Sequence, residues 1–315
     1  MPALKGIKQK EMFGYQVDKE NDDVIYSDGP HIYLSKKDGS RYISVTTLIG
    51  EYENKFNESF FSKYKALEAL ADPDHFSLVK QGLLNTQIWK PELLSKLNID
   101  ETEFDNKVNE ILDSWHNTRD EACDHGSYVH SLMETSFYNK THFDLSNYGS
   151  PQIVGDYTCR PGYYTLDIEH GNYPEYLVSW ISPDGLKISG QVDLLVRDGN
   201  DICIYDYKTN REIKKKSFFN ATKKRNVMMK YPLNNIMDCN YWHYVLQLST
   251  YAYMVQQINP ELNIKELKLV HIDREGKQTI YDLEYRKDDV ERMIKHYAKQ
   301  LKTKELLEKD KPYVI

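Results

Sequence analysis

The chain has 315 residues, enough to build one large domain or two small ones around a sizeable core. Its 40% hydrophobic and 28% charged content is that of an ordinary soluble globular protein. No apolar run approaches the roughly 18 residues that a membrane span requires, and residues 1–6 lack the apolar stretch of a signal peptide. We therefore expect a cytoplasmic protein without membrane contacts.

Charge is unevenly distributed along the chain. The net charge is −7, yet residues 211–230 hold eight basic side chains and a single acidic one, Glu212. A concentrated basic stretch in an acidic chain is typical of contact with a phosphate backbone, although a solvated mobile loop has the same composition. The candidate nucleic-acid-binding residues in it are Arg211, Lys214, Lys215, Lys216, Lys223, Lys224 and Arg225.

The first third of the chain is predicted to start with a loose polar lead-in over residues 1–30. A β-hairpin follows, formed by residues 31–34 and 41–48 around the turn at 37–40, and then a helix over residues 57–70. Ser44 and Thr46 lie at the end of the second strand, where hydroxyl groups either cap a helix or bind a phosphate; capping is the commoner role. Residues 75–100 show no clear pattern.

The rest of the chain alternates between helical and strand patterns. Apolar residues at helical spacing predict a long helix from residue 101 to residue 137, followed by an irregular region over 139–171. Strands are then expected at 174–181, 186–197, 202–208, 264–272 and 279–285, with helices at 240–257 and 287–309. The first three of these strands form an antiparallel meander.

Two aspartates and a lysine are expected to meet at the centre of that meander. The Asp198-Gly199-Asn200 turn places Asp193 beside Asp206, and residues two apart in a strand share a face, so Lys208 lies on the same side. Two carboxylates this close repel each other unless a cation neutralises them, and oxygen ligands suit Mg²⁺ or Mn²⁺. A surface hairpin with an Asp–Lys cross-strand pair is the plainer alternative.

Four short sequence blocks follow one another along the chain: Gly126-x-x-x-His130, Gly190-x-x-Asp193, Asp206-x-Lys208 and Gln247-x-x-x-Tyr251. A glutamate, Glu175, lies between the first two blocks. In this order the blocks resemble the PD-(D/E)xK nuclease superfamily, and within it the RecB-like exonuclease branch, including phage-encoded exonucleases. The Asp-x-Lys block alone is a weak signal, whereas four blocks in order, each on a suitable predicted element, are a strong one.

The resemblance implies an α/β (α+β) fold with a restriction-endonuclease-like core. In that fold a central mixed sheet, including an antiparallel meander, is flanked by helices. We expect residues 1–118 to form an N-terminal hairpin and helical region that packs on the core, and residues 119–315 to form the nuclease core with a basic insertion at 211–232.

The resemblance also implies a set of metal ligands. Asp193 and Asp206 would hold one or two Mg²⁺ or Mn²⁺ ions, helped by His130 and the carbonyl of Tyr207. Glu175 would carry a second ion or a water bound to it. The cysteines lie singly and without a CxxC pair, so the iron–sulfur cluster of some relatives is not expected.

The implied function is metal-dependent hydrolysis of DNA from its ends. Lys208 would orient the attacking water or stabilise charge on the phosphate, and Gln247 and Tyr251 would position Lys208 or the substrate. Partners would be single- or double-stranded DNA and a single-strand-binding or recombination protein, in the host cytoplasm if the gene is phage-borne; the oligomeric state stays open. The alternatives are a structure-specific endonuclease, an inactive DNA-binding protein on this scaffold, and an interaction protein whose basic segment docks an acidic partner.

Overall fold

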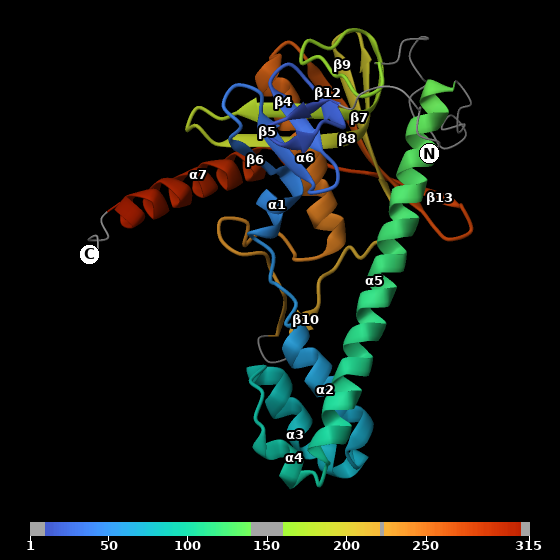
Figure 1. The fold of residues 1–315 in the computed structure, drawn as a ribbon, viewed down its shortest axis with the longest axis vertical. Helices are drawn as coiled ribbons and strands as arrows, with labels where there is room; N and C mark the ends of the chain where they lie inside the picture. The colour runs from blue at the N-terminus through green and yellow to red at the C-terminus, as the bar shows by residue number, and fades with distance from the viewer. Residues whose placement is uncertain (1–9, 140–159, 221–223, 310–315) are drawn as a thin grey trace. The chain divides into compact units, whose positions relative to one another are not determined.

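The computed structural model describes residues 10–139, 160–220 and 224–309. The chain divides into two compact units (Figure 1). The core unit comprises residues up to 53, residues 128–218 and residues from 226 onward, and the helical unit comprises residues 54–127 and 219–225. This division differs from the expected boundary at residue 118, because the N-terminal hairpin belongs to the core unit and the following helices form a unit of their own.

A mixed sheet forms the centre of the core unit. Its long middle strand, β8, pairs antiparallel with β7 over most of its length, antiparallel with β9 at its C-terminal end and parallel with β6 at its N-terminal end. Beyond β9 the sheet continues with β12, parallel to β9, and β13, antiparallel to β12. Among the described residues it contains nine strands: β3 (Lys19–Glu20), β4 (Val24–Ser27), β5 (Ile32–Ser35), β6 (Arg41–Ser44), β7 (Gly171–Ile181), β8 (Lys187–Asp198), β9 (Asp201–Lys208), β12 (Asn263–Ile272) and β13 (Gln278–Asp282).

Helices cover this sheet. Helix α6 (Asn240–Ile258) is the crossover between the parallel strands β9 and β12, and it contacts β7, β8, β9 and β12 (Figure 1). Residues 245–255 of α6 are buried without interruption, as expected of a helix packed against a sheet and against its neighbours α1 (Val45–Gly50) and α7 (Lys287–Lys309). The arrangement confirms the predicted fold class: a central mixed sheet with an antiparallel meander, flanked by helices.

The helical unit is built from α2 (Glu58–Leu70), α3 (Pro73–Thr86), α4 (Glu92–Lys96) and the first part of α5 (Glu101–Tyr138). Its own apolar cluster includes Phe60, Leu67, Phe76 and Phe104. Asp72, whose side chain accepts from the backbone N–H groups of residues 74 and 75, caps α3, and Pro73 occupies the first turn. From residue 128 onward α5 belongs to the core unit. Within the part of the chain that the structure describes, no helix is long and apolar enough to cross a membrane.

Two predictions about local structure need correction, and one stretch without a prediction proves to be helical. The lead-in is not loose: between residues 10 and 30 it forms β1 (Glu11–Met12), β2 (Tyr15–Gln16), β3 and β4. These strands are two to four residues long, too short for a periodic pattern to show. The strand expected over 41–48 ends at Ser44, whose side chain accepts from Thr47 N and caps α1. Residues 75–100 hold α3 and α4, whereas most of the irregular region expected at 139–171 lies outside the described residues.

Candidate active site

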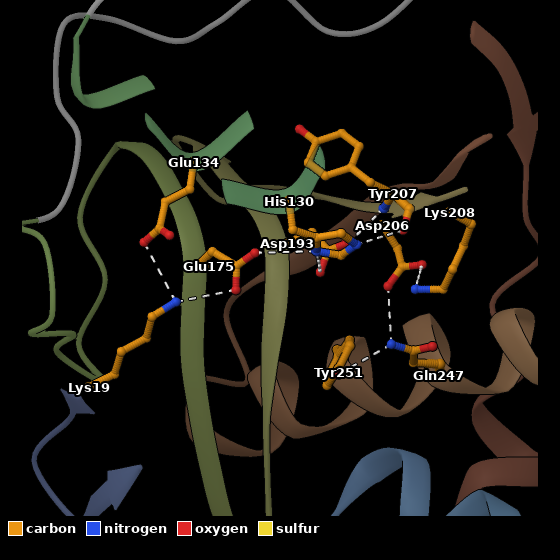
Figure 2. Close-up of polar contacts among 10 residues, drawn as sticks. All are labelled: Lys19, His130, Glu134, Glu175, Asp193, Asp206, Tyr207, Lys208, Gln247 and Tyr251. Atoms are coloured by element: carbon orange, nitrogen blue, oxygen red, sulfur yellow. Dashed lines mark hydrogen bonds and ion pairs between the residues drawn. The ribbon is translucent and has the colours of Figure 1, made fainter. Parts of the chain in front are cut away.

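Strands β8 and β9 carry the two aspartates of the candidate site side by side (Figure 2). Asp193 and Asp206 are both buried. The backbone N–H of Tyr207 donates to Asp193 Oδ2 at 2.6 Å, which fixes the orientation of this carboxylate. Burial, together with the nearby charge of Asp206, raises the pKa of Asp193 to about 7, although His130 and Lys208 act in the opposite direction.

Helix α5 and strand β7 bring a histidine and a glutamate to Asp193. His130 Nδ1 lies 3.5 Å from Glu175 Oε1 and 3.5 Å from Asp193 Oδ1, and His130 Nε2 lies 3.1 Å from the carbonyl oxygen of Tyr207. Burial by itself lowers the pKa of His130, but the two carboxylates outweigh it and raise this pKa to about 9. One ligand atom from each of His130, Glu175 and Asp193 falls within 4.8 Å of the others.

Glu175 has an unusual backbone conformation for a residue within a strand. Its φ is +51°, in the left-handed region that β-strands do not use. The register of β7 with β8 pairs Pro174 with Leu194 and Tyr176 with Val192, so Glu175 falls opposite Asp193, where the pairing is interrupted. Such strained residues cluster at functional sites, because the surrounding structure must hold them.

Lys208 lies at the other end of the site. Its Nζ forms an ion pair with Asp206 Oδ2 at 2.5 Å and lies 5.2 Å from the centre of the Tyr244 ring. Burial alone lowers the pKa of Lys208, but Asp206 and Asp193 outweigh it and hold this pKa above its ordinary value. The ammonium is therefore charged, and the Tyr244 hydroxyl, which donates to Asn210 Oδ1 at 2.5 Å, helps to fix the ring beneath it.

Gln247 and Tyr251 support Asp206 rather than Lys208. Gln247 Nε2 donates to Asp206 Oδ1 at 3.1 Å and reaches the Tyr251 hydroxyl at 3.4 Å. The Tyr251 ring in turn packs on Gly190: a Cβ atom built there would lie 2.8 Å from Tyr251 Cε1 and 3.3 Å from Val45 Cγ2. Gly190 must therefore lack a side chain, because the ring of Tyr251 occupies the space that a Cβ atom would need.

The donor set fits a hard divalent metal ion. The carboxylate oxygens and the carbonyl oxygen suit Mg²⁺ or Mn²⁺, and His130 adds a single imidazole nitrogen to this mainly oxygen-based set. The surplus of buried carboxylates, visible in the raised pKa of Asp193, calls for a further cation. Asp193, Glu175 and His130 would hold it, with the Tyr207 carbonyl beside them. Asp206, expected as a ligand, is not a member of this group and faces Lys208 and Gln247.

The first part of the basic segment is ordered against α6. The backbone N–H of Lys214 donates to Asn240 Oδ1 at 2.8 Å, and the Lys215 ammonium lies 5.1 Å from the ring centres of both Tyr241 and Tyr281. Lys223 lies outside the described residues. The remaining basic candidates in this segment are exposed side chains: Arg211, Lys214, Lys216, Lys224 and Arg225. Ser44 has the capping role considered for it, on α1, and Thr46 is exposed beside it.

Three residues near the site were missed by the sequence analysis. Tyr244 lies three residues before Gln247 on α6, and Glu134 lies four residues after His130 on α5, so helical periodicity would have placed both on the functional faces. Lys19, whose Nζ is 3.3 Å from Glu175 Oε2 and 3.6 Å from Glu134 Oε1, had no such signal, because it enters from the short strand β3.

Known proteins resemble the chain to different degrees. Two solved structures resemble the chain remotely. The crystal structure of SSO0001 matches with a TM-score of 0.32 and 13% identity, over 82% of this chain and 76% of that one. A protein from Eubacterium rectale that carries a provisional exonuclease name matches with a TM-score of 0.30 and 12% identity, over 84% of this chain and 80% of that one. No curated protein matches the chain. The profile of the PD-(D/E)XK nuclease superfamily, by contrast, matches residues 107–311, which include every residue of the His130–Glu175–Asp193 cluster and the Asp206–Lys208 pair, and the chain belongs to this superfamily.

Proposed function

We propose that the protein is a metal-dependent DNA exonuclease of the RecB-like branch. The observation that supports this most is that two groups lie side by side: the His130–Glu175–Asp193 cluster, in which Asp193 is buried, and the Asp206–Lys208 pair on the strand next to Asp193. A divalent ion in the cluster would polarise a scissile phosphate and lower the pKa of an attacking water. Mg²⁺ and Mn²⁺ are the ions that the oxygen donors of the cluster favour.

The protein's own side chains would orient the reacting groups. Lys208 carries a fixed positive charge at the edge of the cluster, where it would stabilise the negative charge that develops on the phosphate during hydrolysis. Gln247 holds Asp206, and Asp206 holds Lys208, so the ammonium is positioned through two successive contacts. The Tyr207 N–H keeps the Asp193 carboxylate turned toward His130.

DNA is the proposed substrate, and its ends are the proposed site of attack. The exposed basic side chains Arg211, Lys214 and Lys216 follow directly after Lys208 in the chain, so a phosphate backbone bound to them would lead toward the site. The proposal of exonuclease action rests on the resemblance of the four motif blocks, in which the helix histidine accompanies attack on ends. A structure-specific endonuclease of the same superfamily is the second candidate.

Digestion of end-labelled linear DNA and covalently closed circular DNA distinguishes the candidates. Each substrate is incubated with the wild type or with Lys208→Ala, in Mg²⁺, Mn²⁺ or EDTA. We expect metal-dependent loss of linear DNA only, abolished by EDTA and by the substitution. Nicking of the circle would favour the endonuclease, and binding without cleavage of either substrate would refute the enzymatic function.

A further inference from the structure

The two oxygens of Glu175 face different cations. Oε1 points to His130 and the proposed metal cluster, whereas Oε2 lies 3.3 Å from the ammonium of Lys19 (Figure 2). The same ammonium lies 3.6 Å from Oε1 of Glu134, on the turn of α5 that follows His130. All three side chains are at most 19% exposed. Lys19 therefore joins two acidic side chains that come from separate elements and belong to one edge of the site.

Lys19 is held in place by its own strand. Two residues further on, the fully buried Asn21 donates through Nδ2 to the carbonyl oxygen of Leu177 and to Ser179 Oγ, both at 3.1 Å. Leu177 lies two residues after Glu175 on β7. The same asparagine accepts from the backbone of the β3–β4 turn through its Oδ1. These bonds fix the end of β3 on β7, so the backbone of Lys19 is held at a defined position next to Glu175.

We propose that Lys19 takes the place of a second metal ion beside Glu175, so that this site binds a single divalent ion. This inference rests on the proposed metal-dependent function and specifies it. A pair of glutamates such as Glu134 and Glu175 is the kind of oxygen donor set that binds Mg²⁺ or Mn²⁺, and in two-metal sites a carboxylate often contacts both ions. Here the Lys19 ammonium neutralises the two glutamates. Because it is a side chain of β3, it cannot dissociate from the site as a metal ion can.

Lys19 lies outside the part of the chain that the superfamily profile matches. The profile matches residues 107–311, and Lys19 lies on a strand of the N-terminal part of the sheet. A shared active site is thus completed by a cation from a segment that the family match does not include. The two lysines stand at opposite ends of the acidic cluster: Lys208 pairs with Asp206, and Lys19 pairs with Glu134 and Glu175.

The test is to count bound ions. Metal-free protein is titrated with Mn²⁺ at fixed pH, and the free ion is measured by its electron paramagnetic resonance signal. We expect one ion per chain in the wild type and two in Lys19→Ala, because removal of the ammonium leaves Glu134 and Glu175 free to bind Mn²⁺. The conservative Lys19→Arg should keep one ion, and Lys19→Ala combined with Glu134→Gln should return the count to one.

A matched control removes a lysine outside the site. Lys10 is half-exposed and pairs with Glu20, the neighbour of Lys19, so Lys10→Ala should leave one ion bound. Thermal unfolding of each variant verifies that it is folded; should Lys19→Ala not fold, Lys19→Met, which retains the side-chain length without the charge, takes its place. Two ions in the wild type, or one ion in the folded Lys19 variant, would overturn the inference. No bound ion in the wild type would instead refute the metal-dependent function itself.

Discussion

The contact between Gly190 and Tyr251 links the stability of the core to the geometry of the active site. In Gly190→Ala the new methyl carbon would lie 2.8 Å from Tyr251 Cε1 and 3.2 Å from its hydroxyl oxygen. The tyrosine ring is buried and its hydroxyl is bonded to Gln247, so it is not a flexible end that can swing away. The substitution therefore has to displace the ring or the strand.

The expected cost follows from overpacking of a buried site. Inserting one methyl group into a well-packed core costs about 1–3 kcal/mol, and replacing glycine by alanine returns about 0.4–1 kcal/mol through the unfolded chain. The midpoints of these two ranges give a net loss of about 1.3 kcal/mol, which corresponds to a fall in Tm of about 3–5 °C for a domain of this size class. Because Tyr251 supports Gln247 and Gln247 holds Asp206, cleavage should slow by at least about tenfold, since displacements of about 1 Å can cost 10²-fold in rate.

Thermal unfolding and single-turnover cleavage measure the two effects on the same preparations. Gly50→Ala is the matched control, because a Cβ there meets nothing within 4 Å, and it should unfold at or above the wild-type temperature. In a Tyr251→Leu background, which lacks the clashing ring atoms, Gly190→Ala should cost much less. A Gly190→Ala protein with wild-type Tm and wild-type rate would refute the reasoning that the close approach demands glycine.

Three further predictions concern the charges of the site. Since the pKa of His130 is about 9 in the metal-free protein, Mn²⁺ binding at pH 7.5 should release about one proton from this residue, and His130→Gln should abolish the release. Calorimetric titration in two buffers of different ionisation enthalpy measures the number of protons released. An equal number in the variant and the wild type would contradict the prediction. Tyr244→Leu should slow cleavage by about twofold to thirtyfold, because it removes an interaction with Lys208 worth about 0.5–2 kcal/mol, whereas Tyr244→Phe retains the ring and most of the rate. Replacing Lys214 and Lys216 by glutamine should make the dependence of log affinity on log salt concentration shallower by about 0.9 for each DNA phosphate that the variant no longer neutralises; equal slopes for variant and wild type, measured on duplex DNA by fluorescence anisotropy, would exclude both residues from the interface.

The antiparallel meander was predictable because its signals are local. Turn residues at 184–185 and 198–200 separate long apolar strands, and the structure confirms β7, β8 and β9 in that order. The parallel pairing of β9 with β12 and of β6 with β8 was not predicted, because it joins segments that lie far apart in the chain and has no turn to mark it. Local patterns report neighbours in sequence, whereas long-range pairing is decided by the packing of the whole core.

In the candidate site, too, local contacts were predictable and long-range contacts were not. The motif spacing brought Asp193 and Asp206 together through one hairpin, and the structure places them on adjacent strands. The motif spacing did not reveal that Gln247 contacts Asp206 instead of Lys208, since the direction of the Gln247 side chain depends on how α6 packs on the sheet. The role of Lys19 could not be predicted, because the sequence of a two-residue strand does not indicate which distant glutamate its lysine will contact.

The parallel pairing of β6 with β8 also has a consequence for the order in which the protein can fold during synthesis. Ile43 pairs with Ile188, so β6 leaves the ribosome long before the strand that covers its edge exists. At roughly 5–20 residues per second, the delay is on the order of ten seconds. Throughout that interval β4, β5 and β6 can form only a small sheet with an open edge, which is the kind of surface that pairs with other chains. Completion of the sheet, and with it the arrival of Lys19 at Glu175, must wait for the second half of the polypeptide.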